Sequence, residues 1–233
     1  IMCLHILLMS TFVALPGQLA AAGFPAAEHW KIYLVTMLIS FVSVVPFIIY
    51  AEVKRKMKRV FVGCVALLLI AEIVLWGAGP HFWELIAGVQ LFFLAFNLME
   101  ALLPSLISKE SPAGYKGTAM GIYSTSQFLG VAIGGSLGGW VDGLFDSQTV
   151  FLAGALLAML WLFVSSTMKE PRYVSSLRVE IPDEVTIGDA LKQRLEATEG
   201  VSEVLIVPEE RSAYVKIDSK VTNRFEVEQA LKA

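Results

Sequence analysis

The sequence predicts an all-α bundle of six transmembrane spans followed by a small α+β domain of the ferredoxin-like class, with the element order βαββα. Two observations carry this prediction. Hydrophobic residues make up 56% of the chain and gather in long runs before residue 169, whereas the chain after it is charged and alternates with a short period. We expect a transmembrane bundle over residues 1–168, a linker over 169–173 and a soluble domain over 174–233.

The apolar runs match the length of helices that cross a bilayer. Runs such as Ile32–Tyr50, Val60–Trp76 and Val150–Ser165 suit a hydrocarbon core of about 30 Å, at about 1.5 Å of rise per residue. The first run, Ile1–Leu15, is shorter, because Pro16 and its neighbours interrupt it. As a helix of about 15 residues it spans roughly 22 Å. We therefore expect a fragment whose true start lies upstream.

Basic residues fall in alternate loops. The segment Glu52–Arg59 is densely cationic, Lys109 and Lys116 flank the loop after the fourth run, and Lys169 and Arg172 follow the sixth. The other loops carry one lysine between them. Cytoplasmic loops are enriched in Lys and Arg, so the basic loops and the soluble tail are expected in the cytoplasm.

The fifth run is rich in glycine at spacings that keep to one helix face. Such a face lets a neighbouring backbone approach closely, and close packing joins helices in lipid. Two interpretations stay open: a tight static contact, or a smooth surface on which two helix bundles rock. The face holds Gly117, Gly121, Gly130, Gly134 and Gly138, and the glycines expected to pack are Gly130, Gly134, Gly135 and Gly138.

Polar side chains inside the apolar runs are candidate site residues, because each is costly in lipid unless paired, hydrated or used. Glu100 lies in the fourth run, with Asn97 three residues earlier on the same helix face. A carboxyl in a low-dielectric setting holds its proton more strongly, which suits a group that exchanges protons near neutral pH. The alternative is that Glu100 caps or braces a neighbouring helix.

Three further polar side chains have two interpretations each. His5 either titrates or is a packing group. Gln127 either binds substrate or forms a hydrogen bond between helices. Glu72, towards the outer end of the third run, is expected to have a structural partner or to reach the membrane interface rather than to couple protons.

The basic loop, the glycine-rich fifth run and the count of six spans resemble the C-terminal half of transporters of the major facilitator superfamily. The family's loop signature has a small residue and an acid followed by basic residues. Ala51 and Glu52 match its start, although Glu stands for Asp, Val53 replaces a basic residue and the central glycine is absent. The loop residues that carry the match are Glu52, Lys54, Arg55, Lys58 and Arg59.

This resemblance implies spans seven to twelve of a twelve-span, proton-linked transporter of the bacterial inner membrane, without its N-terminal six-span half. It also implies that the helices of His5 and Glu100 line a central cavity. The expected function is export of small molecules, and the expected partners are protons, an unidentified small-molecule substrate and the lipid bilayer. The alternative is a membrane-anchored sensor or scaffold whose soluble tail binds a cytoplasmic partner. Glycine-faced helices and a buried Glu–Asn pair favour the transporter, because an anchor has no need of them.

The tail alternates between strand and helix patterns. Thr222 is the expected N-cap of its last helix. No residues remain for a fourth strand, so we expect an open sheet edge through which the tail self-associates or binds a cytoplasmic partner. The expected elements are strands in 176–181, 204–207 and 213–217, and helices in 186–199 and 223–232.

No metal, cofactor or enzymatic chemistry is expected. The tail resembles heavy-metal-associated domains, which carry two cysteines after their first strand, but here that loop is Pro182–Val185 and the tail has neither Cys nor His. Cys3 and Cys64 lie in apolar runs and form no disulfide framework. The chain shows no nucleophile–base pair, and no basic patch of the kind that nucleic-acid binding requires.

The loop charges predict the topology. A reporter that works only in the cytoplasm should be active when fused after Arg172 and inactive within Val141–Thr149, because basic loops stay on the cytoplasmic side. The reverse pattern of reporter activity would contradict this orientation.

Overall fold

The computed structural model describes residues 1–232 and contains two compact units. The first comprises Ile1–Leu103 and Tyr123–Glu170. The second comprises Pro104–Ile122 and the chain from Pro171 onward. The first unit holds the apolar helices and the second holds the soluble domain, and each is described by itself.

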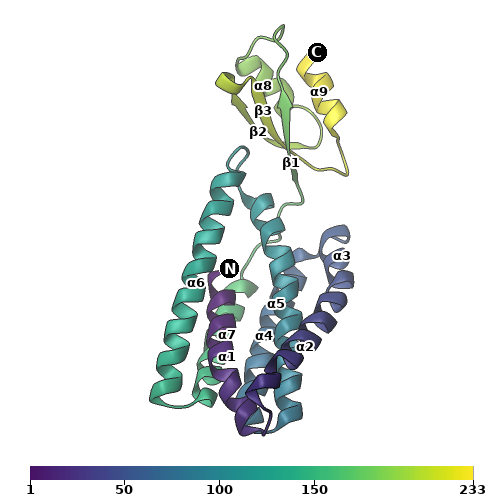
Figure 1. Ribbon diagram of the computed structural model, residues 1–233. Helices are drawn as coiled ribbons and strands as arrows, with labels where there is room; N and C mark the ends of the chain where they lie inside the picture. Colours follow the sequence, from purple (N-terminus) through teal and green to yellow (C-terminus); the bar gives the residue numbers. More distant parts are fainter. Residues whose placement is uncertain (233) are drawn as a thin grey trace. The chain divides into compact units, whose positions relative to one another are not determined.

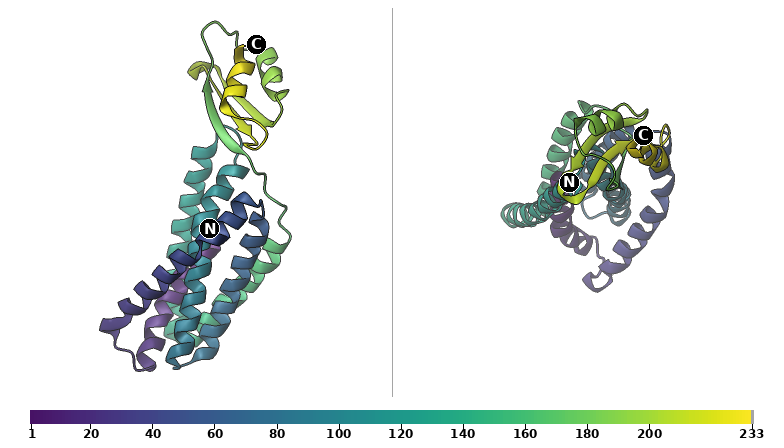
Figure 2. Two further views of the ribbon diagram at one scale, coloured as in Figure 1. Left: turned by 90° about the vertical axis from the view of Figure 1, so that its right-hand side faces the viewer. Right: turned by 90° about the horizontal axis from the view of Figure 1, so that it is seen from above.

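The first unit is a bundle of helices that run side by side, with α2 and α3 on one flank and α6 on the other (Figure 1, Figure 2). Within the described residues, five helical segments are long and apolar enough to cross a membrane. The helix α6 has 29 residues, but its glycines and polar side chains make it less apolar, and it is not among the five. The helices are α1 (Met2–Ala21), η1 (Ala26–Glu28), α2 (His29–Ser43), α3 (Val45–Val53), α4 (Met57–Ala78), α5 (Phe82–Glu110), α6 (Lys116–Leu144) and α7 (Ser147–Ser166).

Pro16 and Pro46 affect their helices in different ways, and Pro16 does not end its helix as expected. The first helix does not end near Leu15: α1 continues through Pro16 to Ala21. A proline removes one helical hydrogen bond, but membrane helices tolerate the loss where the neighbouring helices compensate for it. The second span, in contrast, is interrupted at Val44, and Pro46 lies in the first turn of α3. The missing N–H is harmless at that position, because the first turn of a helix has no acceptor for it.

The glycine face of α6 lies against the backbone of α1. A Cβ atom on Gly130 would come within 2.5 Å of the Met2 carbonyl oxygen, and one on Gly134 within 2.5 Å of the Ile6 carbonyl oxygen. Gly138 approaches Ser10 in the same way, with 2.7 Å to its Cα. A side chain on any of these three positions would therefore push the two helices apart.

The remaining glycines of α6 do not share this contact. A Cβ atom on Gly117, Gly121 or Gly135 would meet nothing within 4 Å. Gly135 follows Gly134 by one residue, which turns it about 100° around the helix, away from α1. Gly135 was expected to pack with the others, and this is corrected: the glycines of α6 that contact α1 lie four residues apart, and Gly135 is not one of them.

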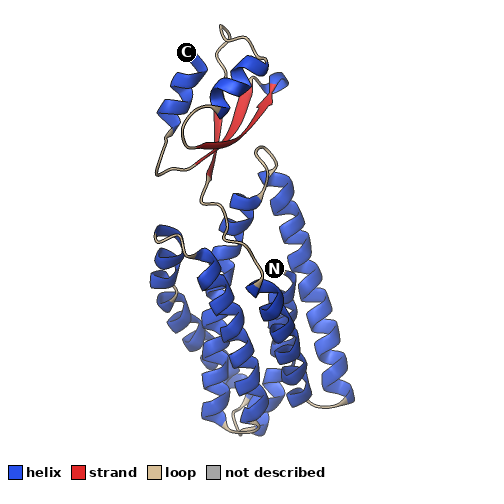
Figure 3. Cartoon of the chain, turned by 180° about the vertical axis from the view of Figure 1, so that it is seen from behind, coloured by secondary structure: helices blue, strands red, loops and turns tan. Residues whose placement is uncertain are grey.

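The soluble domain has the predicted βαββα order, and it is a ferredoxin-like arrangement (Figure 3). Its sheet has the strand order β1-β3-β2, with both pairs antiparallel. Strand β2 begins at Val201, three residues earlier than expected. Helix α8 begins at Asp189, three residues later than expected. The elements are β1 (Ser175–Glu180), α8 (Asp189–Glu196), β2 (Val201–Val207), η2 (Pro208–Glu210), β3 (Ser212–Ile217) and α9 (Arg224–Lys232).

One face of this sheet forms the core of the domain. The pairing places Val215 of β3 opposite both Leu177 of β1 and Val204 of β2, so alternate residues of the three strands share one face. Leu191 and Leu195 of α8 belong to the same buried cluster, together with apolar residues of α9. The N-cap of α9 is Asn223 rather than Thr222: its side-chain oxygen accepts the Glu226 N–H at 3.2 Å, whereas the Thr222 hydroxyl donates to the Glu226 carboxylate.

The opposite face of β3 carries a buried lysine. Lys216 is only 3% exposed, and its ammonium donates a hydrogen bond of 2.6 Å to the backbone carbonyl of Lys109, in the last turn of α5. Carbonyls in that turn lack a helical partner, so this lysine caps a helix end within the second unit. Burial lowers the pKa of Lys216 from its ordinary value.

The contact between α1 and α6 predicts different effects for two adjacent glycines. Gly134→Ala should lower the thermal unfolding temperature of the purified protein, because its methyl group would meet the Ile6 backbone, and overpacking typically costs about 1–3 kcal/mol. Gly135→Ala is the matched control and should leave that temperature unchanged, because its methyl group would meet open space. Equal unfolding temperatures for the two variants would show that α1 and α6 do not pack in this way.

Candidate functional site

The structure brings three of the predicted site residues together inside the helix bundle. His5 on α1 is 4% exposed. Its Nε2 atom lies 2.9 Å from the side-chain nitrogen of Gln127 on α6 and 3.6 Å from Oε1 of Glu100 on α5. Three helices thus contribute one polar side chain each to a single cluster, which we call the His5 cluster.

Both ring nitrogens of His5 have a polar partner. Nδ1 lies 3.3 Å from the backbone carbonyl oxygen of Ile1, and Nε2 lies 2.9 Å from the side-chain nitrogen of Gln127. The buried imidazole is therefore held on both sides, as a buried polar group requires.

The carboxyl of Glu100 lies beside that atom without bonding to it. The 3.6 Å separation is an ion-pair distance but exceeds a hydrogen bond, and Oε1 of Glu100 has no hydrogen-bond partner among the described residues. About a third of the Glu100 side chain is exposed, at 32%. Oε1 itself is buried, so the exposed part of this side chain lies in its other atoms.

Asn97 is the fourth predicted residue, and it contacts none of the other three through a hydrogen bond in the described residues. It lies one turn before Glu100 on α5, and its side-chain nitrogen is buried and lacks an acceptor. Phe96, next to it, packs edge-on against the His5 ring, with 5.7 Å between the ring centroids. The buried and unpaired amide donor of Asn97 is the polar group of this helix face that lacks a partner in the structure.

Of the two placements expected for Glu72, the structure has the first, a structural partner. Its side chain is 0% exposed, so it does not reach the membrane interface. Its structural partner is Thr11 of α1, whose hydroxyl donates a hydrogen bond of 2.7 Å to Oε1 of Glu72. Sequence reasoning overlooked Thr11 and the adjoining Gly154 of α7, although a glycine between two alanines is a sign of close packing.

The cationic segment forms a tight turn between α3 and α4. The helix α3 ends at Val53 and α4 begins at Met57, so Lys54, Arg55 and Lys56 make the connection. Arg55 adopts a positive φ of 53°, a conformation that side chains rarely take. Glycine is the residue that adopts this conformation without steric cost, so Arg55 carries local backbone strain in the turn.

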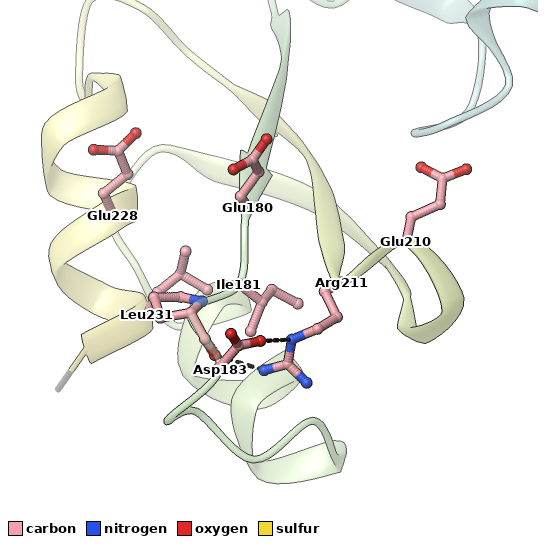
Figure 4. Close-up of a pocket in the computed structure, with 8 residues that line it drawn as sticks. Glu180, Ile181, Asp183, Glu210, Arg211, Glu228 and Leu231 are labelled. Atoms are coloured by element: carbon pink, nitrogen blue, oxygen red, sulfur yellow. Dashed lines mark hydrogen bonds and ion pairs between the residues drawn. The ribbon is translucent and has the colours of Figure 1, made fainter.

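A pocket of about 470 Å³ lies in the soluble domain, at the loop after β1 (Figure 4). Arg211 forms an ion pair with Asp183 at 3.0 Å, and its guanidinium also donates to the Pro182 carbonyl at 2.6 Å. The charged group thus holds the loop in place instead of facing a ligand. Within residues 1–232 no cluster of His, Cys, Asp and Glu side chains could hold a metal ion.

Strands β1 and β2 form the two edges of the sheet, and β1 is the edge where we expect a further strand to pair. Its one hydrogen-bonded neighbour among the described residues is β3. The other side of β1 therefore presents backbone donors and acceptors that a further strand can pair with. In the ferredoxin-like class this edge is where a fourth strand joins.

Comparison with known proteins gives the family. The model of the Major Facilitator Superfamily matches residues 2–195, and the model of the YajR YAM domain matches residues 177–233. The chain belongs to the Major Facilitator Superfamily. Its soluble tail matches the domain that the second model describes.

The chain is similar to curated transport proteins of bacteria. It is 78% identical over 232 residues to the inner membrane transport protein YajR of Escherichia coli (strain K12). The matched region covers 100% of this chain and 51% of that protein. It is 40% identical over 131 residues to the uncharacterized transporter BU466 of Buchnera aphidicola subsp. Acyrthosiphon pisum (strain APS), covering 56% of this chain and 34% of that protein. The chain thus spans about half the length, or less, of these relatives.

We predict that the soluble domain is a metal-free interaction module. Residues 173–233 should fold alone, because α8 and α9 bury one face of the sheet, and should self-associate or bind a cytoplasmic partner through β1. Sedimentation of this domain, with and without excess copper or zinc, should give the same species. A strict monomer without a partner in pull-downs would contradict the edge interaction, and stoichiometric metal uptake would contradict the absence of a metal site.

Proposed function

We propose that this chain is the C-terminal half of a proton-coupled secondary transporter that exports small molecules across the bacterial inner membrane, with its soluble domain in the cytoplasm. Family membership and the printed names of the relatives support a membrane transporter. The single observation that supports proton coupling is the His5 cluster, in which a partly exposed glutamate side chain and an imidazole meet between three helices.

Protonation of this cluster changes the force between α1 and α5. When Nε2 of His5 is protonated and Glu100 is ionised, two opposite charges face each other at 3.6 Å. At an effective dielectric constant of about 20, unit charges this close attract with on the order of 4 kcal/mol. A further proton on Glu100 removes that attraction. Starting from the ion pair, binding of a proton to Glu100 therefore favours separation of the two helices, and release of that proton favours their approach.

Gln127 serves both protonation states of His5. Its amide nitrogen faces the lone pair of the neutral ring, and rotation of the amide by half a turn presents its oxygen to the protonated ring. The cluster can thus change its charge without leaving a buried polar atom unpaired on His5. Such an unpaired atom would cost about 1–3 kcal/mol.

Asn97 offers a further polar group for the substrate near the His5 cluster. Its unpaired amide lies one helical turn from Glu100, so a polar substrate that accepts this hydrogen bond also approaches the Glu100 carboxyl. Proton and substrate would then compete for neighbouring groups of α5, which is the requirement for exchanging one for the other.

A second function, as a sensor or scaffold that acts through the soluble domain, is supported by the open edge of β1. It is compatible with transport, because the edge belongs to the soluble domain and the His5 cluster to the helix bundle.

Substitution of Glu100 tests the proposed coupling. In the full-length protein in liposomes, Glu100→Gln should abolish transport driven by a pH gradient, because an amide cannot take up the proton. Its thermal stability should stay near that of the wild type, because Oε1 of Glu100 accepts no hydrogen bond among the described residues.

Glu84→Gln is the matched control, because Glu84 is an exposed glutamate in the first turn of the same helix. It should transport as the wild type does. A Glu100→Gln protein that keeps the wild-type dependence of transport on pH would show that Glu100 is structural.

A further inference from the structure

A second acidic side chain lies in the membrane part, away from the His5 cluster. Glu72 of α4 is completely buried, and its one hydrogen-bond partner among the described residues is the neutral hydroxyl of Thr11, at 2.7 Å from Oε1. The other oxygen, Oε2, is buried as well and has no partner there. A buried carboxyl is normally paired with a cation or fully hydrogen-bonded, so this site needs an explanation.

None of the helices around Glu72 brings a cation to it. The helix α7 has no acidic or basic residue. In α1 the ionisable side chains are Cys3 and His5, and His5 lies six residues, about 9 Å along the helix, from Thr11 and is engaged with Glu100. Lys58 and Arg59 of α4 itself are at least 13 residues, about 20 Å, away.

The other neighbours of α4 are equally free of cations near Glu72. The helix α5 packs Gly88 against Leu75, one turn from Glu72, and has no ionisable residue between Glu84 and Glu100. The helix α3 has Tyr50 and Glu52, and both lie beside the start of α4, at its other end. The carboxyl is therefore surrounded by apolar and neutral groups.

The space around Oε2 is shaped by a glycine. A Cβ atom on Gly154 of α7 would lie 2.7 Å from Oε2, closer than van der Waals contact allows. The small residue thus makes room for a carboxyl group between α1, α4 and α7. Because α7 comes so close to Oε2, a neutral carboxylic acid fills this space by itself.

We propose that Glu72 is a second proton-binding group of this protein, which carries its proton on Oε2 and ties α1 to α4 and α7 in the neutral form. In this form Oε1 is the carbonyl oxygen that accepts from Thr11, which agrees with the observed hydrogen bond. An ionised carboxylate here would lack any counter-charge in a low-dielectric setting, which costs far more than burying the neutral acid. The inference stands apart from the proposed coupling at Glu100, because it requires no transport.

The helix α1 contacts both acidic side chains, at two different heights. Thr11 and His5 lie on the same helix, so α1 is held by Glu72 at one level and faces Glu100 about 9 Å away. Loss of the proton from Glu72 would leave an ionised carboxylate whose Oε2 atom is buried and unpaired. The neutral acid is therefore the favoured form while α1, α4 and α7 are packed together.

Infrared spectroscopy of the full-length protein in lipid tests the protonation directly. At neutral pH the spectrum should contain the carbonyl band of a protonated carboxylic acid, and Glu72→Gln should remove it. Glu84→Gln, the exposed control, and Glu100→Gln should both keep it. Thr11→Val should move the band to higher wavenumber, because the hydrogen bond from Thr11 weakens the carbonyl bond.

Three results would overturn the proposal. The first is an unchanged band in Glu72→Gln. The second is loss of the wild-type band on addition of sodium at constant pH, which would identify a metal-cation site instead of a proton site. The third concerns Thr11→Val, which also decides the matter if Glu72→Gln fails to fold: a band at the wild-type position would show that it does not come from Glu72.

Discussion

The close contact of α1 with the glycine face of α6 is the constraint on which the arrangement of the membrane part depends. Lipid gives helices no hydrophobic reason to associate, so they are joined by packing and by hydrogen bonds between them. Gly130, Gly134 and Gly138 let the backbone of α1 lie directly on α6. That contact fixes the rotation of α1, and the rotation decides which helices its polar side chains can reach.

Both polar sites of the bundle follow from that rotation. His5 points to α5 and α6, where it meets Glu100 and Gln127, and Thr11 points to α4, where it meets Glu72. The two carboxyls have different surroundings. The Glu100 side chain is partly exposed and lies beside His5, whereas Glu72 is completely buried and accepts a hydrogen bond from a neutral hydroxyl. One helix, α1, thus contacts both acidic side chains.

The sequence was sufficient for what depends on local pattern. The apolar runs and the alternation in the tail predicted the helices and the βαββα order, because periodicity reflects which face of each element is buried. The four-residue spacing predicted the contact face of α6 but wrongly included Gly135, whose direction depends on where α1 lies. Pro16 was misleading, because a proline ends a helix in water more readily than in a packed membrane bundle.

Contacts between distant residues were beyond the sequence. His5, Glu100 and Gln127 were each singled out, but only the packing of three helices shows that they meet. The burial of Glu72 depends on Thr11, which is 61 residues away, and on Gly154 of α7. Neither residue carries a local signal for binding a carboxyl, so the site emerges only from the fold.

A double-mutant cycle at His5 and Glu100, with thermal stability as its readout, asks whether these two side chains form one proton-binding unit. The pH dependence of the unfolding temperature would be measured for the full-length wild type, His5→Gln, Glu100→Gln and the double variant. Residues that act together have non-additive effects. We expect each single substitution to remove the pH dependence that the two side chains share, so that the double variant behaves as the single variants do. Two separate changes in pH dependence that add up in the double variant would contradict the pairing.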